Sequence, residues 1–144
     1  MQVKIKRIDK TLPLPEFKTK GACAIDVYAR KTITILPHSL GFIPSNIIIE
    51  VPEGYVGLLA SRSSTPRKKG LHIPHGMGIM DQDFCGDKDE YIMQVYNPSN
   101  NLITIQRGER IGQVCFVKID KPQFIEVETM ENKNRGGFGT TGQT

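Results

Sequence analysis

Apolar and polar residues alternate with a period of two along several parts of the chain. Near the start, Val3 and Ile5 alternate with lysines, and the same pattern recurs over residues 33–35 and 103–105. A period of two places successive side chains on opposite faces of a strand. These segments therefore predict β-strands with one buried face.

Four denser apolar runs predict further strands, which we expect to be buried on both faces. They cover residues 47–49, 55–59, 91–96 and 114–119. Turn-forming sequences such as Pro-Glu-Gly at 52–54 separate the runs. We find no pattern for a helix longer than about two turns, so the chain predicts an all-β sandwich or barrel.

The last thirteen residues, NKNRGGFGTTGQT, differ in composition from the rest of the chain. They hold four glycines and one large apolar side chain, Phe138, which is too little apolar surface to fold alone. We therefore predict one β domain at residues 1–131 and a flexible glycine-rich arm at residues 132–144. Its charge, ring and hydroxyls suit an arm that closes over a bound anion with a flat base.

Charge narrows the range of partners. The 144 residues carry a formal net charge of +4, which indicates anionic ligands. The basic residues form no long block and do not interleave with aromatic residues, so we expect no nucleic-acid partner. The tightest basic cluster, Arg67 to Lys69, suits either a solvated loop or a local phosphate site.

The cysteines and the hydropathy pattern indicate the compartment. Cys23, Cys85 and Cys115 are far apart and form no C-x-x-C pair, so neither a disulfide framework nor a zinc site is predicted. The start of the chain lacks the apolar run of a signal peptide, and no stretch approaches the roughly 18 apolar residues of a membrane span. We expect a soluble, cytoplasmic protein with no membrane partner.

Five short stretches stand out by their chemistry. They are ACAIDVYA (22–29), GLLASRSS (57–64), KGLHIPHGMGIMDQDF (69–84), GERIGQV (108–114) and RGGFGTT (135–141). In order and approximate spacing they resemble the five signature motifs of the trimeric dUTP diphosphatases, or dUTPases. The resemblance covers nearly the whole chain.

This resemblance implies both a fold and a reaction. The fold is a distorted jelly-roll-like β-barrel that assembles as a homotrimer, with active sites at the subunit boundaries. The reaction is Mg²⁺-dependent hydrolysis of dUTP to dUMP and pyrophosphate, through attack of water at the α-phosphate. It limits uracil incorporation into DNA and supplies dUMP for thymidylate synthesis.

Asp81 matches the family position that orders and activates the attacking water. A carboxylate within hydrogen-bond reach of that water is a suitable general base. Without the surrounding motifs, an aspartate here would equally suit a turn cap. Asp83, two residues later, fits a structural role in the turn better than contact with substrate.

Phosphate binding is assigned to the second, fourth and fifth motifs. The guanidinium of Arg62 offers a planar fork to phosphate oxygens, and the serines after it add hydroxyl and backbone donors. The family usually has proline where this chain has Ser61, a difference that affects loop stiffness. The resemblance implies phosphate contacts by Arg62, Ser63, Ser64, Gln113, Arg135, Thr140 and Thr141.

Asp26 lies where the family has an aspartate that reaches Mg²⁺ through water. The ion prefers to keep several waters and to take its direct ligands from substrate phosphates. This preference accounts for the lack of a dense cluster of metal ligands in the sequence. The alternative is an aspartate that simply ends a strand.

Selection of the base and sugar is assigned to residues 75–84, which we expect to form a hairpin. Its glycines allow the main chain to approach and read the uracil edge. Phe84 occupies the family's aromatic position, where the ring packs under the deoxyribose and leaves no room for a 2′-hydroxyl. The implied contacts are His75, Gly78, Ile79, Met80, Phe84, Ile92 and Phe138.

Two features depart from the family pattern. His75 stands where the family commonly has an asparagine that contacts the base, although histidine can still form one hydrogen bond there. After Gly86, the stretch Asp87 to Asp89 resembles an insertion of about three residues, which could change access to the pocket.

Other functions remain open at this point. A dCTP deaminase shares the fold and the central motifs, but it would need a carboxylate beside the base, and Glu90 is the only nearby candidate. The short chain and the RGGFGTT tail favour the diphosphatase. A nucleotide-binding module without catalysis is the second alternative.

Overall fold

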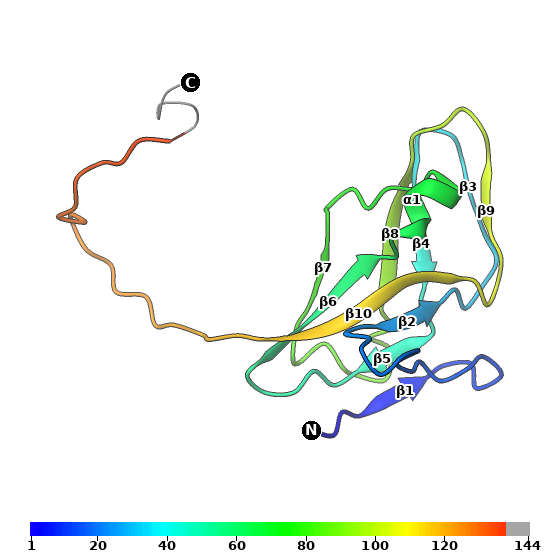
Figure 1. Ribbon diagram of the computed structural model, residues 1–144, viewed down its shortest axis with the longest axis horizontal. Coiled ribbons are helices and arrows are strands. Elements are labelled where there is room, and N and C mark those ends of the chain that lie inside the picture. Colours follow the sequence, from blue (N-terminus) through cyan, green and yellow to red (C-terminus); the bar gives the residue numbers. More distant parts are fainter. Residues whose placement is uncertain (138–144) are drawn as a thin grey trace.

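The structure, a computed structural model, describes residues 1–137 of the chain (Figure 1). Strands dominate the described part, and its one helix has six residues. The predicted all-β class is therefore confirmed. In chain order the elements are β1 (Ile5–Arg7), β2 (Ile25–Tyr28), β3 (Ile33–Ile35), β4 (Ser39–Pro44), β5 (Ile47–Ile49), β6 (Tyr55–Ser61), α1 (Ser64–Lys69), β7 (Gly78–Met80), β8 (Ile92–Asn97), β9 (Ile103–Ile105) and β10 (Arg110–Lys118).

A four-stranded antiparallel sheet organises the molecule, with the strand order β2-β10-β6-β7. The long strand β10 lies inside it and pairs with β2 on one side and with β6 on the other. Strand β7 pairs with the free side of β6. Because each of these strands carries one of the first four motifs, the sheet places segments that are far apart in the sequence on neighbouring strands.

The remaining strands form three two-stranded antiparallel sheets, β1-β5, β3-β9 and β4-β8. All four sheets pack around one apolar core, so the jelly-roll-like architecture is confirmed. In the described part, hydrogen bonding divides this architecture into separate sheets and does not close one continuous barrel. The core residues are Ile25, Val27, Ala29, Ile35, Ile43, Ile47, Ile49, Leu59, Leu71, Tyr91, Met93, Val95, Ile105, Ile111 and Val114.

Three of the dense apolar runs are buried differently from the prediction. Strand β5 is buried at all three positions, as expected. Strand β8 instead alternates exposed and buried residues, β6 buries only part of its length, and β10 leaves Val117 and Lys118 exposed. The reason for β8 is its position, because only one face of the β4-β8 pair covers the core while Ile92 and Gln94 point outward.

The short helix α1 follows the second motif directly. It ends at Gly70, whose φ of 68° is the left-handed conformation that glycine adopts without strain. Arg67, Lys68 and Lys69 occupy the last turn, where cations interact favourably with the helix dipole. The helix therefore gives the basic cluster a local structural role.

Beyond β10 the chain leaves the body of the protein. Figure 1 shows this segment running away from the sheets, and residues 120–136 are exposed. Four large apolar side chains in it are uncovered, namely Phe124, Ile125, Val127 and Met130. In the described residues there is no helix long and apolar enough to cross a membrane.

Candidate active site

The central sheet brings three predicted phosphate and metal contacts together. On β10, Gln113 lies opposite Asp26 of β2 and opposite Ala60 of β6. Its side-chain amide donates to the carbonyl oxygen of Ser61 at 2.9 Å. Strand pairing therefore fixes Gln113 beside the loop that begins at Arg62.

Asp26 accepts hydrogen bonds from two arginines of this region. Nε of Arg62 donates to Oδ1 of Asp26 at 2.8 Å, and Nη1 of Arg110 donates to Oδ2 at 3.0 Å. The Asp26 side chain is only 13% exposed, so its charge depends on these two partners for compensation. The carboxylate thereby orients both guanidinium groups.

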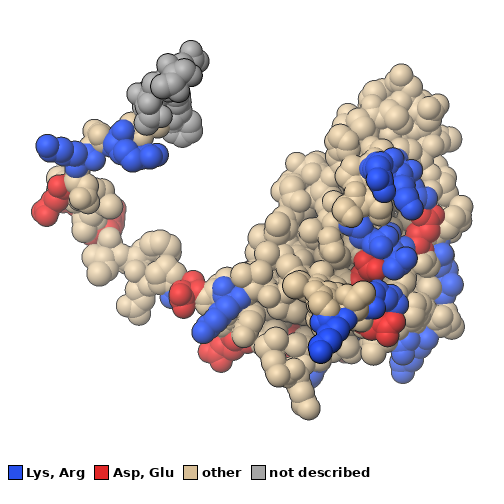
Figure 2. Space-filling view, viewed as in Figure 1, with Lys and Arg blue, Asp and Glu red and all other residues tan. Residues whose placement is uncertain are grey.

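A basic hollow of about 240 Å³ lies beside this contact. Figure 2 shows lysine and arginine side chains gathered over the face that carries α1, with acidic groups between them. Glu109 lines this hollow and accepts from Lys69 at 2.6 Å. Burial raises the pKa of Glu109, but hydrogen bonds from Lys69 and from the Gln106 backbone outweigh it and leave the pKa below its ordinary value. Glu109 is therefore ionised at neutral pH and compensates Lys69.

The two serines of the second motif lie at the start of α1. Ser63 is the N-cap residue, yet its side chain forms no capping hydrogen bond to the helix. Ser64 is the first residue of the helix and lines the basic hollow. The structure thus brings Arg62, Ser63, Ser64 and Gln113 into one region, together with Asp26.

Asp81 directly follows β7, which is the edge strand of the four-stranded sheet opposite β2. Its carboxylate is exposed, while the next side chain, Gln82, donates to the carbonyl of Tyr55 at 2.9 Å and accepts from Lys121 at 2.7 Å. These contacts fix the backbone beside Asp81 and leave its carboxylate open to solvent.

The segment that contains Asp81 is not the hairpin predicted from the sequence. Strand β7 has only three residues and pairs with β6, whereas the following strand, β8, pairs with β4. Gly78 does permit a close approach to Leu59 of β6, because a Cβ added at Gly78 would lie only 3.3 Å from the Cβ of Leu59. Residues 81–91 are therefore a connection between two sheets.

Phe84 lies on this connection and stacks on Tyr91. The two ring centroids are 6.2 Å apart and the planes are inclined by 18°. Phe84 is 41% exposed, whereas Tyr91 is fully buried and its hydroxyl donates to the carbonyl of Ile49 at 3.2 Å. Burial raises the pKa of the Tyr91 phenol well above its ordinary value, so it keeps this proton at neutral pH.

The other predicted base and sugar contacts lie at the edges of this region. His75 and Ile79 are exposed and Met80 is half-buried. Nδ1 of His75 lies 2.9 Å from the carbonyl oxygen of Met77, in a turn where Gly76 has a φ of 75°. Ile92 is on the outward face of β8, so the connection from Asp81 ends beside it.

The Asp81 region and the Arg62 region lie apart within one chain. Asp81 follows Met80, which pairs with Gly57, whereas Gln113 pairs with Ala60. Strand spacing then places the Cα atoms of Asp81 and Gln113 roughly 16 Å apart, on opposite sides of β6. The two groups of a single chain cannot contact the same phosphate.

No group of three or more histidine, cysteine or acidic side chains that could hold a metal occurs in the described part of the chain. Asp26 uses both oxygens for arginines, which does not suit direct ligation. The Asp26 carboxylate does fit an ion that takes its direct ligands from substrate phosphates and meets Asp26 only through water.

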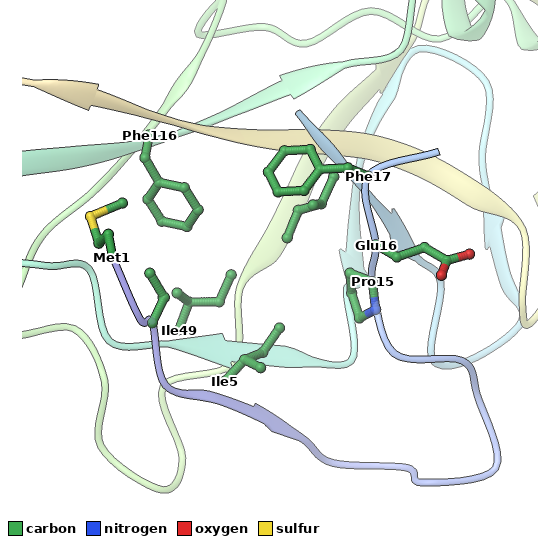
Figure 3. A pocket seen from close by; sticks show the side chains of 9 residues that line it. Met1, Ile5, Pro15, Glu16, Phe17, Ile49 and Phe116 are labelled. Atoms are coloured by element: carbon green, nitrogen blue, oxygen red, sulfur yellow. The ribbon is translucent and has the colours of Figure 1, made fainter. Parts of the chain in front are cut away.

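An apolar hollow of about 300 Å³ lies elsewhere, between the N-terminal strand and β10. Figure 3 shows Met1, Ile49 and Phe116 on one side of it and Pro15 and Phe17 on the other. Its side chains are apolar apart from Glu16, so the hollow offers no side-chain donor for phosphate.

Comparison with known proteins decides the family. The dUTPase family model matches residues 10–142. The chain belongs to the dUTPase family. Its relatives include the deoxyuridine 5'-triphosphate nucleotidohydrolases of Corynebacterium diphtheriae, 37% identical over 97% of this chain and 92% of the relative, and of Dictyoglomus turgidum, 35% identical over 99% of each.

Solved structures agree with this assignment. The dUTPase of Staphylococcus bacteriophage 80alpha with dUpNHpp has a TM-score of 0.83 and 26% identity, covering 99% of both chains. The dUTPase of phage phi11 of S. aureus, 22% identical over 92% of this chain and 100% of the other, has a TM-score of 0.79 and was described with a structural Mg(II) ion. The latter likeness supports the dUTPase fold alone.

Glu90, the candidate for a deaminase, is held in a structural contact. Arg30 donates from Nε and Nη2 to its two oxygens at 2.8 and 2.7 Å, and the backbone of Asn46 donates to Oε1 at 2.8 Å. The Glu90 side chain is 9% exposed. A carboxylate fixed in this way is not available to shuttle protons at a base.

The insertion predicted after Gly86 is held by one contact to the body and by one contact within its own turn. Nζ of Lys6 donates to Asp87 at 2.7 Å, and this pairing lowers the pKa of the Asp87 carboxyl. Asp89 accepts from the backbone of Gly86 at 2.6 Å. Residues 87–89 therefore close a local turn against β1.

Some predicted contacts of the fifth motif fall outside the described residues, namely Phe138, Thr140 and Thr141. Arg135 is described and exposed. Sequence reasoning missed two residues at the candidate site, Arg110 and Tyr91. Arg110 had a signal, since it lies three positions before Gln113 in the same motif, but Tyr91 was visible only as one apolar residue of a strand.

Proposed function

We propose that this dUTPase-family chain hydrolyses dUTP to dUMP and pyrophosphate. The family match over residues 10–142 and relatives named deoxyuridine 5'-triphosphate nucleotidohydrolase support the reaction. The bacteriophage 80alpha enzyme, of similar fold, was solved with the nucleotide dUpNHpp. The single observation that carries the proposal is the oriented Arg62 guanidinium beside Gln113, with the open carboxylate of Asp81 directly after a separate strand.

The chemical step assigns one role to each group. Asp81 accepts a proton from a water molecule, which attacks the α-phosphorus. A new P–O bond forms to that water, and the bond between the α-phosphorus and the bridging oxygen breaks. Pyrophosphate leaves with the bridging oxygen, and the α-phosphate remains on dUMP.

Charge on the triphosphate is balanced by donors of the second, fourth and fifth motifs. Arg62 and the Ser63 and Ser64 hydroxyls bind phosphate oxygens, and Gln113 contributes its amide. Arg135, Thr140 and Thr141 add contacts from the C-terminal arm. Because Asp26 holds Arg62 in place before ligand arrives, little side-chain ordering remains for the binding step.

Mg²⁺ is the proposed cofactor, held by substrate phosphates and reaching Asp26 through water. When bound, it neutralises phosphate charge and makes the leaving group better. Asp26 also retains its role in orienting arginine.

Base and sugar selection falls to the segment around β7. Main-chain groups at Gly78, Ile79 and Met80 read the uracil edge, and His75 adds one side-chain hydrogen bond. Phe84 forms the floor under the deoxyribose and excludes a 2′-hydroxyl by contact. Ile92 and Phe138 complete the apolar walls.

The family resemblance implies a homotrimer, and the geometry of one chain supports sites shared between copies. The Asp81 and Gln113 regions are roughly 16 Å apart by strand spacing, so a complete site combines parts of different copies. Uncovered apolar surface supports the same conclusion, because Leu40, Phe42 and Ile92 are 52%, 54% and 39% exposed on one face of β4-β8. The exposed apolar side chains after β10 add a second surface that a neighbouring copy would cover.

The domain organisation and cellular role complete the proposal. The domain is assigned to residues 1–131, although its packed strands end with β10 at Lys118, and the arm at 132–144 is proposed to close over the site. In a cytoplasmic setting the reaction limits uracil incorporation into DNA and supplies dUMP for thymidylate synthesis.

One assay tests the proposed function directly. The purified chain is incubated with Mg²⁺ and dUTP, dCTP, UTP or dTTP in turn, and the products are separated. We expect dUMP and pyrophosphate from dUTP alone. Ammonia from dCTP would instead indicate the deaminase, and binding of dUTP without any product would indicate a nucleotide-binding module.

A further inference from the structure

The ring of Phe84 has two different environments. One face stacks on Tyr91, with centroids 6.2 Å apart and planes inclined by 18°, which is an offset parallel arrangement. The side chain is nevertheless 41% exposed. A ring supported on one side and open on the other is suited to contact a ligand with its open face.

Tyr91 is the most firmly held residue of this region. Its backbone N–H donates to the carbonyl of Ile47 at 3.0 Å, and its own carbonyl accepts from the backbone of Ser45 at 2.9 Å. Its hydroxyl donates to the carbonyl of Ile49 at 3.2 Å, and its side chain is fully buried. These three bonds fix both the backbone and the plane of the ring against β5 and Ser45.

Phe84 itself has weaker support from the chain that carries it. Its backbone N–H donates to the carbonyl of Asp81 at 3.4 Å, a long hydrogen bond within a turn. A phenyl ring has no hydrogen-bonding group, so packing alone sets its orientation. The packing partner identified by ring geometry is Tyr91.

We propose that Tyr91 is a positioning residue for sugar selection, which holds the Phe84 ring in the orientation that excludes a 2′-hydroxyl. This inference rests on the proposed function. An apolar wall rejects one added hydroxyl only modestly, and a wall that can tilt rejects it less. Rigid support of Phe84 by Tyr91 therefore raises discrimination between dUTP and UTP. Only UTP carries the 2′-hydroxyl that meets the ring, so dUTP does not depend on this rigidity.

The test compares two substitutions at Tyr91 in the full-length protein. Tyr91→Leu removes the ring and keeps an apolar side chain, whereas Tyr91→Phe keeps the ring and removes only the hydroxyl. The quantity measured is the ratio of kcat/KM for dUTP to kcat/KM for UTP. We expect Tyr91→Leu to lower this ratio about threefold to tenfold, the range that corresponds to loss of one offset aromatic pair, and Tyr91→Phe to keep it within about twofold of wild type.

A role in folding alone would give a different result, because it would lower kcat/KM for both nucleotides together. An unchanged ratio in Tyr91→Leu would overturn the proposal. If that variant does not fold, the wild-type protein supplies a second measurement, the nuclear Overhauser effect between the Phe84 and Tyr91 ring protons with dUMP bound. Its presence supports the stack in the working site, and its absence overturns the proposal. Wild-type turnover of dUTP tests the proposed function separately from this ratio.

Discussion

Arg62 donates from Nε to Oδ1 of Asp26 across 2.8 Å, although the two residues are 36 positions apart in the sequence. The second oxygen of the same carboxylate accepts from Arg110 at 3.0 Å. One half-buried aspartate thus orients two guanidinium groups beside the loop that we assign to phosphate binding. A charge-assisted contact of this kind limits the rotamers of Arg62 before any ligand arrives.

Asp26→Asn is the first prediction, since an amide keeps the shape and removes the charge that holds both arginines. We expect KM for dUTP to rise about tenfold, the effect of losing about 1.4 kcal/mol of binding. The Mg²⁺ concentration for half-maximal rate should rise as well. Steady-state kinetics at several Mg²⁺ concentrations measure both, with the exposed Asp120→Asn as control. An unchanged Mg²⁺ dependence would restrict Asp26 to orienting the arginines.

Asp81→Asn tests the general base. The amide cannot accept the proton of the attacking water, so kcat should fall about a thousandfold, within the range for loss of a general base. Binding of a non-hydrolysable dUTP analogue, measured by calorimetry, should persist. The matched control is Asp83→Asn, two residues along the same exposed turn, which we expect to retain kcat. Equal loss in both variants would contradict a special role for Asp81.

Glu90→Gln separates a structural carboxylate from a catalytic one. Breaking the paired contact with Arg30 leaves a largely buried guanidinium with a weaker partner, so the free energy of unfolding should fall by about 2 kcal/mol. Turnover of dUTP should remain near the wild-type value at a temperature where the variant is folded. Urea unfolding measures the loss, and the exposed Glu16→Gln should leave the free energy of unfolding unchanged. A large loss of kcat in a folded Glu90→Gln variant would refute the structural role.

A chain that ends at Lys133 tests the arm. Loss of Arg135 and of the three predicted contacts after it should lower kcat/KM for dUTP about a hundredfold, because a poorly enclosed substrate is poorly aligned for attack. The thermal midpoint and the molecular mass in solution should match those of the full chain. A second truncation that ends at Gly142 keeps all four predicted contacts and should retain activity. Full activity of the shorter chain would show that the arm does not close the site.

The buried phenol of Tyr91 predicts a pH effect on stability. Its pKa is raised by burial above the ordinary value of 10.0, so the folded protein keeps this proton at pH values where the unfolded chain has lost it. Its stabilising contribution is complete below about pH 10 and declines as pH rises toward the folded-state pKa, with a slope of up to about 1.4 kcal/mol per pH unit. Urea unfolding between pH 9 and 11 measures this slope. Tyr91→Phe should show a smaller decline, and equal declines would contradict the assignment to Tyr91.

The local pattern of apolar and polar residues was sufficient to predict many strands of the fold. The alternation of Ile33 and Ile35 with threonines predicted β3, and the same pattern predicted β9, because side-chain direction in a strand depends on the strand itself. The dense runs also located β5, β6, β8 and β10. Their burial on one face or two could not be predicted, since it depends on which sheet covers the other side.

The candidate site shows a similar division. The motifs identified Arg62, Gln113 and Asp26 one by one, from residue type and order along the chain. Their contact requires β10 to lie between β2 and β6, a pairing that the sequence does not state. Arg110, whose partner Asp26 is 84 positions away, was missed for that reason.

The sequence by itself determined the strand-rich composition, the order of the motifs and the chemical groups available for phosphate and water. Only the tertiary structure decided which groups meet. It placed Asp81 and Gln113 on opposite sides of β6, turned Glu90 toward Arg30 and set the Phe84 ring on Tyr91. The physical reason is that side-chain chemistry and strand periodicity are local properties, whereas strand pairing and ring packing depend on contacts between residues that are distant in the chain.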